Sequence, residues 1–240
     1  MRLKKVKEVT QEQGPPTGGF LSWLRRTRRA QRTDEGVSVP CGACRACCTS
    51  SYFIHISPDE TQTLAKIPQE LLFAAPGLPE GHVVLGYDHN GHCPMFINNR
   101  CSIYAHRPQT CRTYDCRIFP ATGLSAGKDK PLITQQARRW EFEFPTAQDH
   151  KHFAALQAVA KFLREHPDAF PPGFVPSNST QRAVVAIKVY EVFLNSTKAS
   201  EKGKPRVLNH EIVEAIIAAY DKFETKRGAD KQVKIRSSPP

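Results

Sequence analysis

Four of the eight cysteines in the chain lie within the eight-residue stretch CGACRACC. Cys41, Cys44 and Cys47 form a C-x2-C-x2-C pattern, and Cys48 follows directly. Two intervening residues allow a loop to turn so that its thiolates converge on one ion, and this spacing occurs in both zinc and iron–sulfur sites. Adjacent side chains tend to point apart. We therefore predict that Cys47 and Cys48 serve two neighbouring metal ions, or that one of them bridges.

The other four cysteines form a second cluster with irregular spacing. They are Cys93, Cys101, Cys111 and Cys116. Four thiols plus four suggest either two four-ligand sites or one multinuclear site, and the spacing does not give the pairing. The basic start of the chain is followed by QEQGPPTGG rather than by an apolar run, so we expect no signal peptide and a reducing, cytoplasmic location. Clustered thiols there favour metal binding, with disulfides in an oxidising compartment as the alternative.

Taken together, these motifs resemble a known family. CGACRACC, then Cys93-Pro94, then CSIYAHRPQTCRTYDC appear in the order of the CxxCxxCC cysteine-cluster family, which is described as chelating zinc or iron. The resemblance covers about residues 41–119 and leaves the metal open. It implies that every cysteine of the chain is a metal ligand: Cys41, Cys44, Cys47, Cys48, Cys93, Cys101, Cys111 and Cys116.

Four further residues match the family pattern between the later cysteines: Tyr104, Arg107, Pro108 and Arg112. A metal ion surrounded by thiolates is an anionic group. Guanidinium groups beside it would offset that charge and donate hydrogen bonds to sulfur. We predict this supporting role for Arg107 and Arg112, with ordinary surface ion pairs as the alternative. The histidines of the region are interpreted as non-ligands, because eight thiols already suffice.

The predicted function is metal binding, with zinc or iron as the bound metal and chelation, delivery or scaffolding as its purpose. The alternative is an iron–sulfur cluster protein with a redox or methyl-transfer-associated enzymatic role. A C-x2-C-x2-C pattern with a remote Cys-Pro is similar to ferredoxin ligation. The resemblance also extends, through the cysteine motif, to flagellin lysine methylases. Since the chain shows no glycine-rich cofactor loop, we predict no catalytic residue.

The fold class predicted from hydrophobic periodicity is α-rich with a minor β part. We expect a flexible basic arm over residues 1–36, a cysteine module over 37–145, a helical part over 146–226 and a flexible tail over 227–240. Within these, the sequence predicts a helix from a Ser57–Glu60 capping box, strands within 81–88 and 138–145, and helices over 146–165, 179–195 and from Asn209.

The net charge of +11 is concentrated near the ends, since residues 1–36 hold nine Lys/Arg against four Asp/Glu. A short basic helix over 20–32 is expected to dock on the body through a small apolar face: Phe20, Leu21, Trp23 and Leu24. The simplest interpretation of the basic ends is that they keep the protein soluble. Nucleic-acid binding through RRTRR is the less favoured interpretation. No apolar run approaches the roughly 20 residues of a membrane span.

Overall fold

The computed structural model describes residues 18–194 and 209–237, apart from residues 34 and 38, and side chains of the last helix as far as residue 228. The described part of the chain is mostly helical with a few short strands, which confirms the predicted α-rich class with a minor β part. Among the described helices, none combines the length and apolarity that crossing a membrane requires.

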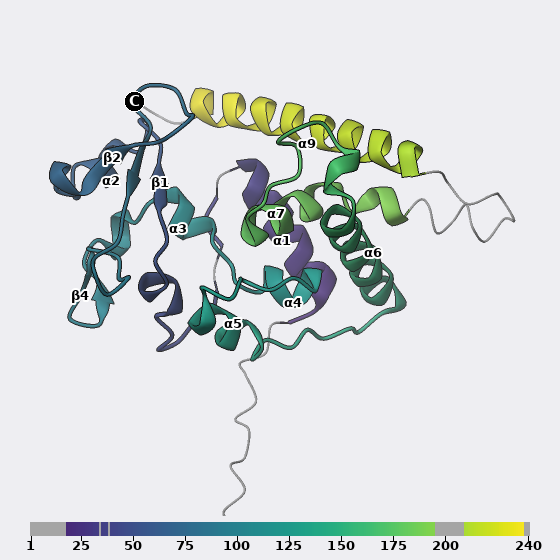
Figure 1. The fold of residues 1–240 in the computed structure, drawn as a ribbon, viewed down its shortest axis with the longest axis horizontal. Helices are drawn as coiled ribbons and strands as arrows, with labels where there is room; N and C mark the ends of the chain where they lie inside the picture. The colour runs from purple at the N-terminus through teal and green to yellow at the C-terminus, as the bar shows by residue number, and fades with distance from the viewer. Residues whose placement is uncertain (1–17, 34, 38, 195–208, 238–240) are drawn as a thin grey trace, which may run out of the picture.

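The helical elements follow one another along the chain with short 3-10 turns between them. The α-helices are α1 (Phe20–Thr33), α2 (Thr61–Leu64), α3 (Gln109–Thr113), α4 (Ile118–Thr122), α5 (Pro131–Ala137), α6 (Ala147–Glu165), α7 (Ser179–Val189) and α9 (Asn209–Ser237). The 3-10 turns are η1 (Ala46–Thr49), η2 (Gln69–Leu71), η3 (Tyr104–His106) and η4 (Pro167–Ala169). In Figure 1 the short strands lie at the left, helices α6 and α7 lie to the right of them, and the long helix α9 runs along the top.

The strands form a small antiparallel sheet and a separate hairpin. Strands β1 (Ile54–Ile56) and β2 (Leu72–Ala74) both pair with β3 (Val83–Leu85), which confirms the strand predicted within 81–88. The hairpin joins β4 (Phe96–Ile97) to β5 (Arg100–Cys101). Its turn residues Asn98 and Asn99 have φ of 50° and 62°. Asparagine tolerates this left-handed conformation, which two-residue hairpin turns require.

Two hydrophobic clusters hold these elements together. The smaller one lies under the sheet and includes Ile56, Leu85 and Met95. The larger one joins α1, α4, α5, α6, α7 and α9. Leu156 of α6 and Ile187 of α7 are fully buried in it. The helical residues near the end of the cysteine region, such as those of α4, therefore pack with the C-terminal helices rather than with the sheet.

Helix α1 is part of the larger cluster, which corrects one expectation. Phe20, Trp23 and Leu24 are 0%, 1% and 0% exposed, so the predicted docking of this helix is confirmed. Residues 20–33 are not part of a flexible arm, because three large apolar side chains within five residues bury together. Residues 1–17 lie outside the described part of the chain. The tail also differs, since α9 continues through residue 237.

The start of α6 ties α1 to the helical body. As predicted, Thr146 caps α6, and the cap is a reciprocal one with Asp149. The Thr146 backbone N–H donates to Asp149 Oδ2 at 3.1 Å. The other carboxylate oxygen of Asp149 accepts from the Leu21 backbone N–H at 2.9 Å. One side chain therefore serves the first turns of two helices.

The segment over 138–145 is extended but does not join a sheet. Trp140, Phe142 and Phe144 turn inward while Glu141 and Glu143 are exposed, so the predicted alternation is confirmed. Among the described residues, its pairing is a single parallel bridge between Glu143 and Gly19. Gly19 directly precedes α1, so the neighbouring segment enters a helix at this point.

The helix predicted from Ser57 is much shorter than expected. The Ser57 backbone N–H donates to Glu60 Oε1 at 3.0 Å, which is half of the expected capping box. The other carboxylate oxygen of Glu60 accepts from the backbone N–H of Gln109 at 2.6 Å. The α-helix covers only Thr61–Leu64. The Glu60 carboxylate also binds the backbone of Gln109 at the start of α3, and Pro68 interrupts the apolar run that follows Leu64.

Substituting Leu24 by alanine should lower the free energy of unfolding by about 2–5 kcal/mol, because the fully buried side chain leaves a cavity. Urea unfolding followed by circular dichroism measures this loss. Leu132→Ala is the matched control, since Leu132 is 46% exposed and should change stability by about 0.5 kcal/mol or less. Equal losses in the two variants would contradict the placement of α1 in the core.

Candidate metal centre

All eight cysteines are free thiols, and they come from three segments of the chain. The first is the CGACRACC loop, which ends in η1. The second is the loop from Cys93 to the β5 residue Cys101. The third contains α3, with Cys111, and the turn after it, with Cys116. Cys116 is buried, and the remaining thiols belong to residues that are half-buried or exposed.

Backbone contacts place the first segment beside the second. The Cys93 backbone N–H donates to the Cys48 carbonyl at 2.8 Å, and the Ser51 N–H donates to the Gly91 carbonyl at 2.8 Å. Gly91 has a φ of +77°, and a side chain there would collide with the Ser51 hydroxyl. A glycine at this position therefore allows the two loops to run close together.

Arg45, inside the first cysteine motif, connects the same two segments. Its Nε donates to the carbonyl of Asn99, at the tip of the hairpin, at 2.9 Å. Its Nη1 donates to the Gly42 carbonyl at 3.1 Å and to the Cys44 carbonyl at 2.8 Å. Sequence analysis missed this residue, although a cation between the second and third cysteines of the motif was a signal that could have identified it.

The adjacent pair Cys47 and Cys48 interacts with thiols of all three segments. Interaction between the two thiols lowers the pKa of Cys47 to about 7. The same interaction raises the pKa of Cys48. Cys47 also acts on Cys41, Cys93 and Cys111.

Cys41, Cys44 and Cys116 form what we call the first thiol group. Burial raises the pKa of Cys116 to about 12, and the nearby charges of Asp115, Cys41 and Cys44 act in the same direction. Loss of hydration raises the pKa of Cys41 to about 11, followed by the effects of Cys47 and Cys44. Mutual influence of this kind means that the three thiols are neighbours.

Cys48, Cys93, Cys101 and Cys111 form the second thiol group. Burial raises the pKa of Cys111 to about 12, with further contributions from Cys47, Cys93 and Cys101. Cys93 and Cys111 likewise raise the pKa of Cys48. Three members, Cys93, Cys101 and Cys111, pack against the hydrophobic cluster under the sheet, whereas Cys116 belongs to the larger cluster. Cys47 acts on thiols of both groups.

The donor set suits a thiophilic metal, because zinc and iron are both held by clustered cysteine thiolates. Among the described residues, no three His, Cys, Asp or Glu side chains already converge as the ligands of one ion. The thiols are thus gathered by loops and short turns without a closed coordination shell. Closing one requires the thiols to lose their protons and the loops to draw together.

Of the residues predicted to support the thiols, Arg107 lies beside the second thiol group. Its guanidinium stacks 4.1 Å from the Tyr104 ring centroid and donates to the Tyr104 carbonyl at 3.0 Å. Burial raises the pKa of Cys101, and the positive charge of Arg107 opposes this rise. Tyr104 itself is 65% exposed. Its ring holds the guanidinium in place.

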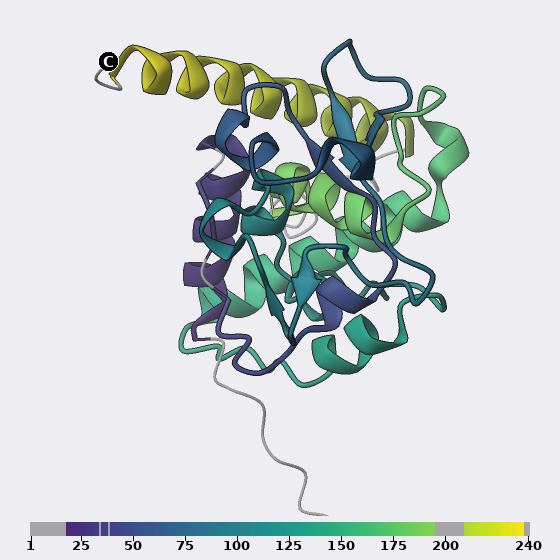
Figure 2. The ribbon, with the colours of Figure 1, turned by 90° about the vertical axis from the view of Figure 1, so that its left-hand side faces the viewer.

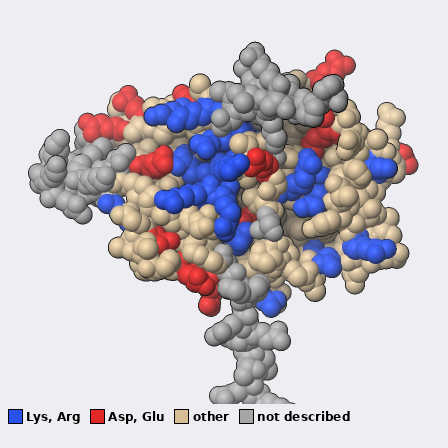
Figure 3. Space-filling model, turned by 180° about the vertical axis from the view of Figure 1, so that it is seen from behind, with Lys and Arg blue, Asp and Glu red and all other residues tan. Residues whose placement is uncertain are grey.

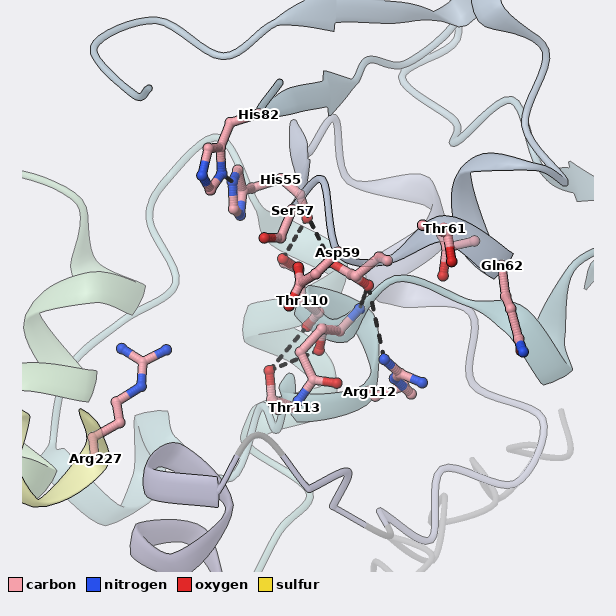
Figure 4. A pocket seen from close by; sticks show the side chains of 13 residues that line it. His55, Ser57, Asp59, Thr61, Gln62, His82, Thr110, Arg112, Thr113 and Arg227 are labelled. Atoms are coloured by element: carbon pink, nitrogen blue, oxygen red, sulfur yellow. Dashed lines mark hydrogen bonds and ion pairs between the residues drawn. The ribbon is translucent and has the colours of Figure 1, made fainter. Parts of the chain in front are cut away.

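Arg112, by contrast, faces a cavity that contains no thiol (Figure 4). Its guanidinium pairs with Glu60 at 3.8 Å. The cavity has a volume of about 620 Å³ and is also lined by His55, His82 and Arg227 of α9. His55 Nε2 and His82 Nδ1 are 2.9 Å apart and share a hydrogen bond. Cys111 therefore belongs to the second thiol group, whereas the adjacent Arg112 side chain lines the cavity.

Comparison with known proteins identifies the cysteine region. Residues 40–140 match a family model described as "CxxCxxCC: Putative zinc- or iron-chelating domain". The match covers less than half of the chain, and residues 40–140 are called the CxxCxxCC domain below. Its bounds enclose all eight cysteines, and its description supports metal binding by this part of the chain. No curated protein and no solved structure matches the chain.

The CxxCxxCC domain is attached to the helical body through a buried polar network around Cys116. Trp140 Nε1–H donates to Cys116 Sγ at 3.1 Å. Asp115 accepts from Trp23 Nε1–H of α1 at 2.9 Å and from Arg117 Nη2 at 2.8 Å. Asp115 and Arg117 are 2% and 4% exposed. Sequence analysis missed this network, although a charged residue on each side of Cys116 was visible in YDCRIF.

Replacing Asp115 by alanine should lower the free energy of unfolding by about 3–5 kcal/mol, because the buried Arg117 guanidinium would lose its counter-charge. Urea unfolding of the full chain measures this change. The control is Glu165→Ala, which removes an exposed ion pair with Arg164 and should cost about 1 kcal/mol or less. A loss at Asp115 no greater than the control would contradict the role assigned to this carboxylate.

Proposed function

We propose that the CxxCxxCC domain binds zinc or iron through its eight cysteine thiolates, in two neighbouring four-thiolate sites. The observation that carries this proposal is the gathering of eight free thiols from three segments around the Cys47–Cys48 pair. The family description supports metal binding in general. The number of sites and their ligands are our own inference from the structure.

The first proposed site completes the first thiol group with Cys47, and the second site is the second thiol group. Cys48 is assigned to the second site because its strongest thiol neighbours beyond Cys47 are Cys93 and Cys111. Cys47 is assigned to the first because it is adjacent to Cys48 and four-coordination leaves one place beside Cys41, Cys44 and Cys116. Two neighbouring sites give each member of the adjacent pair its own ion.

The chain supplies charge compensation for such sites. A divalent ion held by four thiolates is an anion, and cations nearby stabilise it. Arg45 reaches the first motif and opposes the desolvation of Cys47. Arg107 lies beside Cys101 and Cys111. Trp140 directs an N–H at the sulfur of Cys116. Each contact favours the thiolate over the thiol at its site.

The role that we propose for the metal is to cross-link the three cysteine segments, so the function is chelation or scaffolding rather than turnover of a substrate. A bound ion would supply the stability that an unclosed set of loops lacks. Free thiols also fit a reducing compartment, for which we propose the cytoplasm. Metal delivery would use the same ligands, with exchange of the ion as the additional requirement.

Metal analysis of chain purified without oxygen tests the proposal. We expect about two zinc or iron ions per chain, on the basis of four ligands for each ion. Acid-labile sulfide should be absent. Sulfide equal to iron would instead establish an iron–sulfur cluster, and metal-free, fully folded protein would contradict the proposal.

Single Cys→Ser variants should fall into two sets according to the ion that they lose. Cys116→Ser and Cys111→Ser should each lose about one equivalent and keep the other, because they belong to different sites. His92→Asn is the control, since His92 is next to Cys93 but is not proposed as a ligand; it should keep the full metal content. Two cysteine variants that both lose all metal, or both lose none, would contradict the division into two sites.

A further inference from the structure

Helix α1 has five arginines among its 14 residues and no acidic residue in its first turn. Its apolar side, with Phe20, Trp23 and Leu24, is buried in the core. Because this side of the helix faces the core, the opposite side faces solvent. Arg25, Arg26 and Arg29 are consequently exposed. These three residues are called the arginine face below.

The arginine face belongs to a larger basic surface. Helix α1 is at the left of Figure 2, on the side that Figure 3 shows directly. Lys and Arg side chains gather over the centre of that side (Figure 3). Helix α9 packs against α1 and adds the exposed residues Lys222 and Lys226.

Few carboxylates oppose this charge. Arg28, which is half-buried, pairs with Glu191 and lies over the rings of Tyr190 and Phe223. Arg29 pairs with Glu35 at 3.2 Å, but the arginine side chain is 68% exposed and such surface pairs contribute little. In the described part of the chain, Arg25 and Arg26 have no ion pair within bonding distance.

We propose that the arginine face of α1 binds the phosphodiester backbone of nucleic acid without sequence preference. Guanidinium groups bind phosphate oxygens in pairs of hydrogen bonds. Arg25 and Arg29 are one helical turn apart, or about 6 Å along the axis. Docking of α1 holds them in place, so binding does not have to order a flexible segment. The inference is independent of the metal proposal.

The surroundings of the arginine face favour nucleic acid over the other polyanions. A membrane-surface helix inserts its apolar side into the bilayer, but this side of α1 is occupied by the core. Protein interfaces usually centre on buried aromatic side chains as well as arginine. The large hydrophobic side chains that are exposed among the described residues all lie within the CxxCxxCC domain, from Phe53 to Leu132. Phosphate contacts remain as the source of affinity.

Fluorescence anisotropy with labelled 20-base-pair DNA and RNA duplexes, titrated with the full chain as purified between 50 and 200 mM KCl, tests the proposal. Wild type should bind both duplexes, with an affinity that falls steeply with salt. The variant R25Q/R26Q/R29Q should bind at least about tenfold more weakly at 50 mM KCl. Its slope of log affinity against log salt should be smaller by about three, or about one for each arginine.

Two matched variants make the result specific. K66Q/K128Q/R138Q removes the same charge from exposed residues of the CxxCxxCC domain and should keep affinity within about threefold of wild type. R25K/R26K/R29K retains the charge and should keep most of the salt slope. Unfolding midpoints of all variants are compared with wild type, and only folded variants are titrated.

Several outcomes would overturn the inference. They are an absence of duplex binding at 50 mM KCl, equal losses for the arginine-face variant and the charge-matched control, and binding to phosphatidylserine vesicles or polyglutamate in preference to both duplexes. Equal binding of DNA and RNA would assign the shared phosphate backbone as the ligand. A preference for one duplex would support the proposal and identify that duplex as its source.

Discussion

The buried carboxylate of Asp115 is the interaction on which the rest of the structure depends. It accepts hydrogen bonds from Trp23 of α1 and from Arg117, and all three side chains are almost fully buried. The next residue along the chain is Cys116, whose sulfur accepts from Trp140. A single polar network therefore joins the N-terminal helix, the last cysteine and the segment that leads into α6. Buried groups of this kind are costly when unpaired, so the network is satisfied only when these elements are together.

The thiols show the opposite condition, because their surroundings disfavour the charged thiolate. Loss of hydration and mutual repulsion raise the pKa values of Cys41, Cys111 and Cys116 to between about 11 and 12. Loops gather these groups, but regular structure contributes little beyond the short hairpin and α3. A metal ion would exchange the protons for stronger bonds and would close the loops. The buried network at Cys116 thus holds one ligand of the proposed site in place, whereas binding of the metal ion would bring the remaining thiols together.

Local chemistry could be predicted from the sequence where one residue type carries the information. The cysteine pattern identified the CxxCxxCC domain, and the Thr146 cap and the inward side of α6 followed from helical spacing. The role of α1 could not be foreseen fully, because an apolar face of four residues beside many arginines does not reveal which part of the protein it packs against. Trp140, Phe142 and Phe144 alternate as a strand would, yet their neighbour is the start of α1. Arg112 shows the same limit, since only the fold turns it from the thiols toward Glu60 and the cavity.

X-ray absorption at the edge of the bound metal tests the central claim most directly, because it counts the atoms around the ion in the intact chain. The account predicts a shell of about four sulfur atoms, at about 2.3 Å if the metal is zinc. It predicts no nitrogen ligand, since the histidines near the cysteines are assigned no bond to metal. A shell dominated by nitrogen or oxygen, or a purified chain that holds no metal, would contradict the account.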